Sequence, residues 1–520
     1  MCNVIFKIPP VRRSSSGRTK GLALSMMLVA TGAHAAVQDI TVGPNPPCGP
    51  NVDYSYAARP GLPVNETIGQ SGATGNVQWE FALFEGVPGM CVQDGANQKL
   101  AHCGGLDVTL PNEPNQTVSN MAKVTLTANP TNSDLNKEGY LTLRVTDSAA
   151  GNACATRRYR LRVISGGSGW GDPHMTTIDG VHYDFQSAGE FVALRGEKFE
   201  VQTRQRPVST TTVPGPSQYT GLGVCVSLYS AVAARIGSNK VTLQPNLNGQ
   251  PDPSGLQLRV NGNLVTTFPE GGIPLRANRS TDPRAALEGR VVRGEGGTYE
   301  FDDVDGTQLV ATPQYWNAHQ TWYMNLDVYQ TSAGQGIWGK LAGGSWLPAL
   351  PDGTSLGVMP QPLDQRYQDL YVKFADAWRV DKTSPSLFDY APGTSTATFT
   401  TTDWPRFNAQ SCLIQNEPPA QPTTPQIAAQ ACSAIANPAA KADCTFDVMV
   451  TGETGFAQTY ATSQAFRPNG PGFQPVLPGT GSTPVPPKPV NKWPWWWWIP
   501  ILIVVLIVIA VLITRKPTTA

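Results

Sequence analysis

The stretch that decides the predicted fold is residues 170–207, WGDPHMTTIDGVHYDFQSAGEFVALRGEKFEVQTRQRP. Apolar and polar side chains alternate over residues 181–185 and again over residues 199–204, which is the two-residue period of half-buried strands. The apolar run 191–194 between them predicts a strand buried on both faces. Asp-Gly and Ala-Gly steps supply the turns, because glycine adopts positive φ without steric cost. We therefore expect three strands in an antiparallel meander.

The same stretch resembles the opening of a von Willebrand factor type D domain. A second segment, FADAWRVDKTSPSLFDY at 374–390, resembles the end of such a domain. The resemblance covers about residues 166–390, with a weaker extension to Tyr460, and so many elements in order match far more specifically than one short motif. The opening elements are Gly-Asp-Pro-His at 171–174, Thr-Ile-Asp-Gly at 177–180, Tyr-Asp-Phe at 183–185, Gly-Glu-Phe at 189–191, Phe-Glu-Val-Gln at 199–202 and Arg-Pro at 206–207.

The rest of the chain predicts an all-β protein with one short helical part. Further alternating segments, and an Asn-Gly hairpin signal at 261–262, make the type D region (166–390) predominantly antiparallel β. Residues 36–165 predict an immunoglobulin-like β-sandwich, since alternating strands are separated by long polar intervals. The segment 391–465 resembles the cysteine-bearing extension that often follows type D domains, and its Ala-rich run 426–436 predicts a short helix.

Both ends of the chain carry localisation signals. Residues 1–35 have a basic region, an apolar core and an Ala-His-Ala cleavage site, which predict a signal peptide; cleavage one residue later and a retained anchor are the alternatives. A Pro/Gly-rich stalk (466–494) precedes the apolar run 495–514, which is long enough for one transmembrane helix with an aromatic belt. Residues 515–520 would then be a cytoplasmic tail. We expect a single-pass membrane protein whose ectodomain lies on the cell surface or in the periplasm.

The stalk contains a second anchoring signal. The motif Leu477-Pro478-Gly479-Thr480-Gly481, followed by the apolar run and a basic tail, resembles a sortase sorting signal. A long Pro-rich spacer departs from that pattern, and Pro, Gly and Thr are common in this segment. Retained membrane anchoring is favoured over processing at the Thr-Gly bond.

The cysteine count predicts disulfides and argues against a zinc site. Apart from Cys2 in the signal, eight cysteines remain, and the translocated chain would meet an oxidising compartment. We expect two bonds in each half, with three connectivities open per half, and no Cys-x-x-Cys pair supports a metal. The candidates are Cys48, Cys91, Cys103 and Cys154 in the first half and Cys225, Cys412, Cys432 and Cys444 in the second.

The bond between Asp172 and Pro173 is a candidate for self-cleavage. In some type D proteins the Gly-Asp-Pro-His segment cuts itself between Asp and Pro, and the resemblance implies the same chemistry here. The favoured alternative is a structural turn at the domain entrance.

Metal binding has three further candidates. The resemblance would place a calcium loop at 336–343, but lysine and alanine stand where oxygen ligands are expected. The same segment lacks the Cys-x-x-Cys of covalent multimers, so no disulfide-linked multimer is expected. A carboxylate cluster is formed by Asp302, Asp303 and Asp305, for which a solvated hairpin turn is the favoured interpretation. The other candidate set is His174 and His182 with Asp172 and Asp184, for which structural or exposed histidines are favoured.

Composition limits the function classes. Lys plus Arg and Asp plus Glu balance at 38 each, so charge gives no reason to expect nucleic acid as a partner. No enzyme motif appears, and no cofactor is expected beyond the calcium candidate. We expect a non-enzymatic protein that binds an unidentified protein or surface ligand, as in adhesion. The alternatives are self-assembly in an envelope layer and autoproteolysis at residues 172–173. The low cysteine content for a type D domain suggests a bacterial source.

Overall fold

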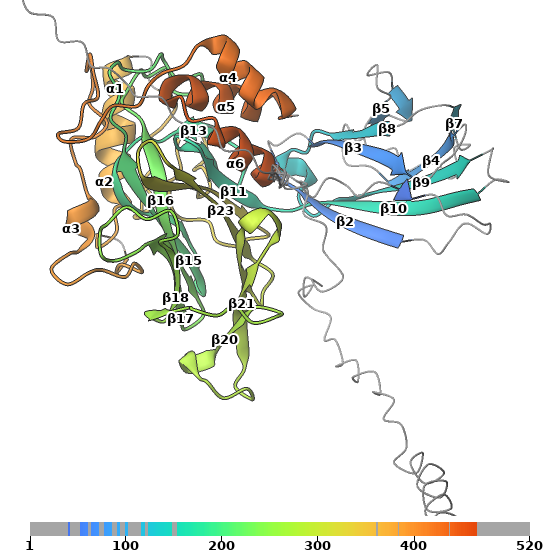
Figure 1. Ribbon diagram of the computed structural model, residues 1–520, viewed down its shortest axis with the longest axis horizontal. Helices are drawn as coiled ribbons and strands as arrows, with labels where there is room; N and C mark the ends of the chain where they lie inside the picture. Colours follow the sequence, from blue (N-terminus) through green and yellow to red (C-terminus); the bar gives the residue numbers. More distant parts are fainter. Residues whose placement is uncertain are drawn as a thin grey trace, which may run out of the picture. The chain divides into compact units, whose positions relative to one another are not determined.

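The computed structural model describes residues 40–41, 52–60, 64–71, 77–85, 91–93, 99–101, 116–119, 123–147, 153–359, 362–382, 384–435 and 437–464. Over these residues the chain consists mostly of antiparallel β-sheets with few helices, which confirms the β-rich fold class (Figure 1). The predicted signal peptide, stalk, sorting signal and transmembrane run lie outside them. None of the helices within the described ranges is long and apolar enough to cross a membrane.

The N-terminal region contains two five-stranded sheets. The predicted alternation appears in them as burial, since Leu143 and Val145 are buried while Arg144 between them is exposed. Most neighbouring strands are antiparallel, but β1 pairs with β3, and β2 with β10, in parallel. The first sheet has the order β1 (Ile40–Thr41), β3 (Val64–Ser71), β8 (Lys123–Ala128), β5 (Cys91–Gln93), β6 (Lys99–Ala101), and the second β2 (Val52–Ala58), β10 (Ala153–Val163), β9 (Glu138–Asp147), β4 (Val77–Glu85), β7 (Gln116–Ser119).

The central region, residues 166–464, contains an eight-stranded and a six-stranded sheet. Every strand pairing in both sheets is antiparallel. The larger sheet has the order β13 (His182–Asp184), β12 (His174–Thr176), β11 (Gly166–Trp170), β24 (Thr321–Tyr329), β23 (Gln308–Trp316), β22 (Tyr299–Asp303), β21 (Leu287–Arg293), β20 (Ile273–Arg276), and the smaller β14 (Gly189–Arg195), β15 (Phe199–Pro207), β16 (Ser227–Ile236), β17 (Asn239–Pro245), β18 (Leu256–Val260), β19 (Asn263–Leu264).

The two sheets of the central region share one apolar core. Met175 and Tyr183 of the larger sheet and Phe191 and Tyr229 of the smaller sheet belong to the same cluster of buried side chains. Each fully buried aliphatic or Phe side chain in such a core contributes about 1.5–3 kcal/mol. The core therefore fixes β12 and β13, at the edge of the larger sheet, against the strands that follow them.

The predicted meander over residues 181–204 is wrong in one respect. Strand β13 pairs with β12 across the Asp179-Gly180 turn, whereas β14 and β15 form a hairpin in the other sheet. The chain changes sheets between Asp184 and Gly189. Alternation identifies strands but not the partner of each strand, because local pattern carries no information about pairing across distant segments.

Strand β15 was predicted to be half-buried, but both of its faces are covered. Its polar residues Gln202 and Arg204 are buried. Gln202 donates to the carbonyl of Pro385 at 2.9 Å and accepts from the amide of Leu387 at 2.8 Å, and the Arg204 guanidinium lies 3.5 Å from the centroid of the Phe399 ring. A later segment of chain therefore closes the face that the alternation predicted to be exposed.

The Asn-Gly signal at 261–262 does form the hairpin between β18 and β19. Asn261 has φ 52° and Gly262 has φ 83°, as a two-residue turn with both central residues at positive φ requires.

One helical stretch was not predicted. Helix α1 (Leu363–Tyr367), the π-helical segment η4 (Gln368–Phe374) and α2 (Ala375–Ala377) follow one another, and Leu370, Phe374 and Trp378 are buried at four-residue spacing. That spacing is a helical signal in the sequence. Three short 3₁₀ segments, η1 (Asn132–Asp134), η2 (Ala277–Arg279) and η3 (Glu295–Gly297), also precede the extension, and α3 (Thr396–Phe399) lies near its start.

The extension is helical over more residues than predicted. The expected helix corresponds to α4 (Pro425–Ala431) with η5 (Cys432–Ala434), and α5 (Pro438–Thr451) and α6 (Gly455–Gln464) follow. Helix α5 begins at Asn437, whose side chain accepts from the amides of Ala439 and Ala440, and it ends at Gly452 with φ 69°. Helices α4, α5 and α6 pack together, with α6 against β23 and β24 (Figure 1).

Candidate functional site

A buried cluster of one histidine and four aspartates lies where β12, β13 and α5 meet. His174 begins β12, and Asp184 ends β13 directly opposite it in the strand register. Asp172 lies in the turn before β12, and Asp443 and Asp447 lie one helical turn apart on α5. All five side chains are buried, and those of Asp172 and Asp447 are 0% exposed. Segments up to 275 residues apart in the sequence thus contribute to one site.

Glycine at position 171 allows α5 to approach the turn. Gly171 has φ +56°, and a Cβ placed on it would lie 1.7 Å from Asp447 Oδ2. Its amide donates to Asn325 Oδ1 at 2.9 Å, and the next amide, of Asp172, donates to Asp447 Oδ1 at 3.3 Å. The Gly-Asp-Pro turn is therefore held from one side by β24 and from the other by α5.

His174 has a carboxylate at each ring nitrogen. Nδ1 lies 2.6 Å from Asp184 Oδ1, while Nε2 lies 2.8 Å from Asp172 Oδ1 and 3.2 Å from Asp447 Oδ1. Burial by itself lowers the pKa of His174, but the surrounding carboxylates, first of them Asp443, raise it well above its usual value overall. The raised pKa favours the imidazolium form, in which Nδ1 donates to Asp184 Oδ1 and Nε2 donates to Asp447 Oδ1.

The helix carboxylates are held closer to their neutral forms. Burial raises the pKa of Asp443 to about 6, opposed by His174 and by hydrogen bonds from Gln218 and Tyr219. Burial, followed by the charge of Asp172, raises the pKa of Asp447 well above its usual value. Like charges in a site of low polarity cannot all ionise at little cost, and the cluster relieves this by protonation.

Asp172 differs from the other carboxylates. Tyr460 donates to Asp447 Oδ2 at 2.9 Å and Gln218 donates to Asp443 Oδ1 at 2.8 Å, but neither oxygen of Asp172 accepts a hydrogen bond. Among the described residues its ion-pair partner is His174, whose Nε2 lies 2.8 Å from Oδ1. A buried carboxylate that has one ion-pair neighbour but accepts no hydrogen bond is costly to maintain and is chemically the most available group of the cluster.

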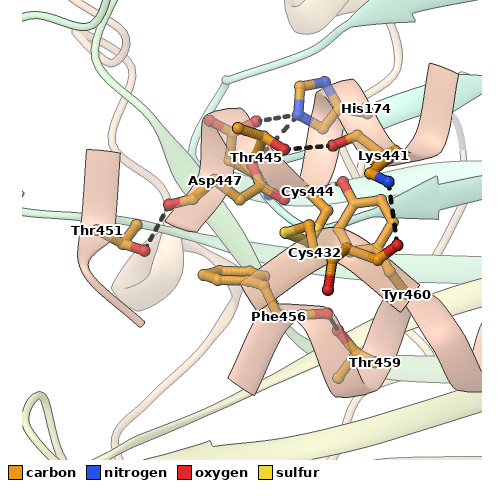
Figure 2. The surroundings of a disulfide bond; sticks show 12 residues. His174, Cys432, Lys441, Cys444, Thr445, Asp447, Thr451, Phe456, Thr459 and Tyr460 are labelled. Carbon is orange, nitrogen blue, oxygen red and sulfur yellow. Dashed lines mark hydrogen bonds and ion pairs between the residues drawn. A yellow bond between two sulfur atoms is a disulfide. The ribbon is translucent and has the colours of Figure 1, made fainter. Parts of the chain in front are cut away.

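Aromatic rings and a disulfide surround the cluster. The ring of Trp170 lies edge-on to that of Tyr460 at 5.6 Å, and the rings of Phe446 and Tyr219 lie 6.1 and 6.5 Å from that of His174. Figure 2 shows Cys444 on the same helix as Asp447, facing Cys432, with His174 opposite Asp447. The disulfide therefore ties the preceding turn to the helix that supplies two of the carboxylates.

Two of the predicted disulfides are resolved pair by pair. Cys225 bonds to Cys412 and Cys432 to Cys444, so all four cysteines of the central region are paired among themselves. Cys154 is also disulfide-bonded. Cys48 and Cys103 lie outside the described residues, and for Cys91 only the backbone of β5 is described.

The histidine and aspartate set taken from the sequence is only partly assembled. The structure brings Asp172, His174 and Asp184 together. The Nδ1 of His182 is 3.0 Å from Thr176 Oγ1, and its ring stacks on that of Tyr219. Asp443 and Asp447 were missed, although their four-residue spacing after a helix-capping Asn-Pro was a usable signal.

The carboxylates at 302–305 occupy the hairpin between β22 and β23. Asp302 accepts from Arg290 Nε at 3.0 Å and from Gln308 Nε2 at 2.9 Å, and the Asp303 carboxylate accepts from the amide of Asp305 at 3.3 Å. Burial raises the pKa of Asp302 to about 6. The Asp302 and Asp303 carboxylates therefore accept hydrogen bonds from the hairpin and from the neighbouring strand β21.

The segment 336–343 packs into the core. Trp338 is fully buried and its indole donates toward Met175 Sδ at 3.0 Å, while the amides of Ile337 and Trp338 pair with carbonyls of β14. Lys340 is exposed. This segment thus serves as an additional strand-like contact for β14.

Comparison with known proteins does not identify the chain. No family model matches it. Among solved structures, a DUF4466 family protein from Parabacteroides merdae is 9% identical, and the match covers 55% of this chain and 96% of that chain with a TM-score of 0.14. A TM-score this low supports no statement about fold or function.

Proposed function

We propose that this chain is an extracytoplasmic type D protein that cuts its own backbone between Asp172 and Pro173. One observation carries the proposal: the Asp172 carboxylate is fully buried, accepts no hydrogen bond, and lies 2.8 Å from a histidine whose pKa is raised. A carboxylate that is not occupied by donors is available as a nucleophile. The resemblance of residues 166–390 to type D domains supports the same bond.

The reaction needs only the residues of the cluster and one water. The Asp172 carboxylate attacks its own main-chain carbonyl carbon, forming a carbon–oxygen bond, while the bond from that carbon to the Pro173 nitrogen breaks. The proline nitrogen takes a proton and becomes a new amino terminus. The cyclic anhydride left on Asp172 is opened by water, which returns two carboxyl groups. The net change is hydrolysis of one peptide bond.

His174 is the proton donor in this scheme. It is charged at neutral pH, its Nε2 already faces Asp172, and Asp184 at Nδ1 fixes the orientation of the ring. Asp447 is a positioning residue, because Oδ1 holds both the Asp172 amide and His174 Nε2. General acid catalysis of this kind is worth about 100- to 10,000-fold in rate.

A set of variants of the full chain tests the assignment. Asp172→Asn and His174→Ala should slow appearance of the cut by about 100-fold or more, within the usual range for a general acid. Asp447→Asn should slow it by less. His182→Ala is the matched control, since that histidine lies on the next strand and should leave the rate unchanged. Circular dichroism of each variant checks the fold, and equal cleavage by folded wild-type and His174→Ala chains would refute the role of the histidine.

An extracytoplasmic location is proposed from the signals at the chain ends and from the disulfides. Disulfides form and persist mainly in oxidising compartments, and two complete bonds are present here. Protein binding or adhesion at the cell surface or in the periplasm remains our proposal for what the ectodomain does there, with envelope self-assembly as the alternative. Dose-dependent self-association of the purified chain would favour the alternative over a foreign ligand.

A further inference from the structure

The cluster also contains the ligand set of a metal site. One oxygen of Asp172, one nitrogen of His174 and one oxygen of Asp447 all lie within 4.8 Å of one another. His174 Nε2 is 2.8 Å from Asp172 Oδ1 and 3.2 Å from Asp447 Oδ1. With metal–ligand bonds of about 2.0–2.2 Å, ligand atoms around one ion lie about 3–3.5 Å apart. The two distances from His174 Nε2 are therefore close to the spacing of coordinated atoms, and the two carboxylate oxygens lie within 4.8 Å of each other.

The charge of the cluster points to a cation. Four buried aspartates surround a single imidazole, so the cluster would carry an excess of negative charge if all four were ionised. Among the described residues, no lysine or arginine forms an ion pair with these aspartates. The independent sign is Asp172, which is 0% exposed and whose two oxygens accept no hydrogen bond. Apart from the ion pair between Oδ1 and His174 Nε2, these oxygens have no partner among the described residues, and a metal ion is a partner that they can bind.

The neighbours of the three ligands are those that orient metal ligands. Asp184 lies 2.6 Å from His174 Nδ1, the carboxylate–histidine arrangement that leaves Nε2 as the ligating nitrogen. Tyr460 donates to Asp447 Oδ2 at 2.9 Å and leaves Oδ1 facing the histidine. The nitrogen ligand favours a transition-metal ion over calcium or magnesium, which prefer all-oxygen sites.

We propose that Asp172, His174 and Asp447 bind one divalent transition-metal ion, with Zn²⁺ as the representative, and that the bound ion holds the chain uncut. A metal on His174 Nε2 occupies the position of the proton that Pro173 must receive, and a metal on Asp172 occupies the attacking oxygen. The regulatory half of this proposal, that the bound metal prevents the cut, rests on the proposed function. The binding half, that the three residues bind a metal, does not.

Metal binding is tested on the purified full chain after treatment with a chelator. Calorimetric titration with Zn²⁺, and the visible absorption of Co²⁺ as a second probe, should show one equivalent bound by wild type and by His182→Ala. His174→Ala and Asp447→Asn should bind at least 10-fold more weakly, because loss of even an orienting residue costs 10- to 100-fold in affinity. Asp447→Asn keeps the side-chain shape, so its unfolding temperature separates loss of a ligand from loss of fold. Absence of binding by wild type, or equal binding by all four chains, would overturn the site.

Regulation is tested by making the chain in a cell-free oxidising reaction with either Zn²⁺ or chelator present. The cut should appear at least 10-fold more slowly with Zn²⁺. One equivalent of metal bound by a chain that never cuts would support the site and reject the proposed self-cleavage. Cutting by a chain that binds no metal would do the reverse, and cutting at equal rates with and without Zn²⁺ in a chain that binds it would reject the regulatory half alone.

Discussion

At the scale of single residues, the cluster around His174 places several groups in protonation states that they do not favour in water. The four aspartates share one histidine, and burial raises the pKa of Asp443 and of Asp447. Because the pKa values of these groups are raised in the folded chain, their contribution to the free energy of unfolding falls as the pH rises. An ordinary salt-bridged aspartate has a lowered pKa, and its contribution rises with pH. The same residues are those that the proposed cleavage and metal binding use.

The first prediction concerns pH and Asp443. Burial raises its pKa from the ordinary value of 3.8 to about 6 in the folded chain. It therefore favours folding most below pH 3.8, and this contribution is lost as the pH rises through 6. The loss amounts to about 3 kcal/mol for a shift of this size. Asp443→Asn should therefore flatten the fall of unfolding free energy between pH 4 and 7, measured by guanidinium titration. An unchanged pH profile would contradict the raised pKa.

The second prediction separates the two reasons why residue 171 must be glycine, its positive φ and the close approach of Asp447. Gly171→Ala would place a Cβ 1.7 Å from Asp447 Oδ2 at a φ of +56°. Gly353→Ala is the matched control, since Gly353 has φ +86° with no atom near the added Cβ. We expect a loss of about 1 kcal/mol in the control and clearly more in Gly171→Ala, together with slower cleavage. Thermal unfolding measures the stability loss of both variants. Equal losses would show that α5 is not packed against this turn.

At the scale of elements, the disulfides act on different parts of the central region. The bond between Cys225 and Cys412 closes a loop of 187 residues, while that between Cys432 and Cys444 closes one of 12. The short loop holds η5 to the middle of α5, next to Asp443. The long loop connects the residues just before β16 to the part of the extension that precedes α4.

The third prediction follows from these loop lengths. Replacing both cysteines of the long loop by Ala should lower the unfolding free energy by about 5 kcal/mol, and replacing both of the short loop by about 3 kcal/mol, on the chain-entropy relation. Cleavage should respond in the opposite order, with the larger effect in Cys432→Ala/Cys444→Ala, because that pair holds the helix of the site. A larger effect on cleavage from the long loop would contradict the role given to α5.

Elements were easier to predict than their partners. Residues 191–194 and the Asn-Gly turn at 261–262 gave correct local structure, because burial on both faces and positive φ leave local marks in a sequence. The placement of β13 and β14 in different sheets leaves no such local mark in the sequence. In the site, Asp172 and His174 are neighbours in sequence and were found, whereas Asp443 and Asp447 arrive from a helix some 270 residues later, which no local pattern connects to β12.

At the scale of the whole molecule, the proposed cut divides a chain that non-covalent contacts hold together. Before the cut lies β11, which pairs with β12 on one side and with β24 on the other. Arg59 adds a buried ion pair with Asp327 at 2.7 Å, and Trp170 donates to the same carboxylate at 3.0 Å. The N-terminal fragment therefore contributes a strand to the interior of the larger sheet.

The fourth prediction is that no covalent bond joins the two fragments. All four cysteines after residue 172 pair among themselves, so Cys154 must pair with a cysteine that precedes the cut. After cleavage the fragments should separate on a denaturing gel without reductant, yet elute together from a sizing column under native conditions. Asp327→Asn should weaken their association, with Asp352→Asn, on an exposed loop, as the control. Fragments that separate only after reduction would contradict this disulfide assignment.

The most direct test of the central claim is the intact mass and N-terminal sequence of the purified full chain, denatured without reductant and with metal removed beforehand. Self-cleavage predicts one fragment that ends at Asp172 and another that begins Pro173-His174-Met175, and a single uncut species from Asp172→Asn. One intact wild-type chain after prolonged incubation without metal at neutral pH, or a cut at any other bond, would contradict it.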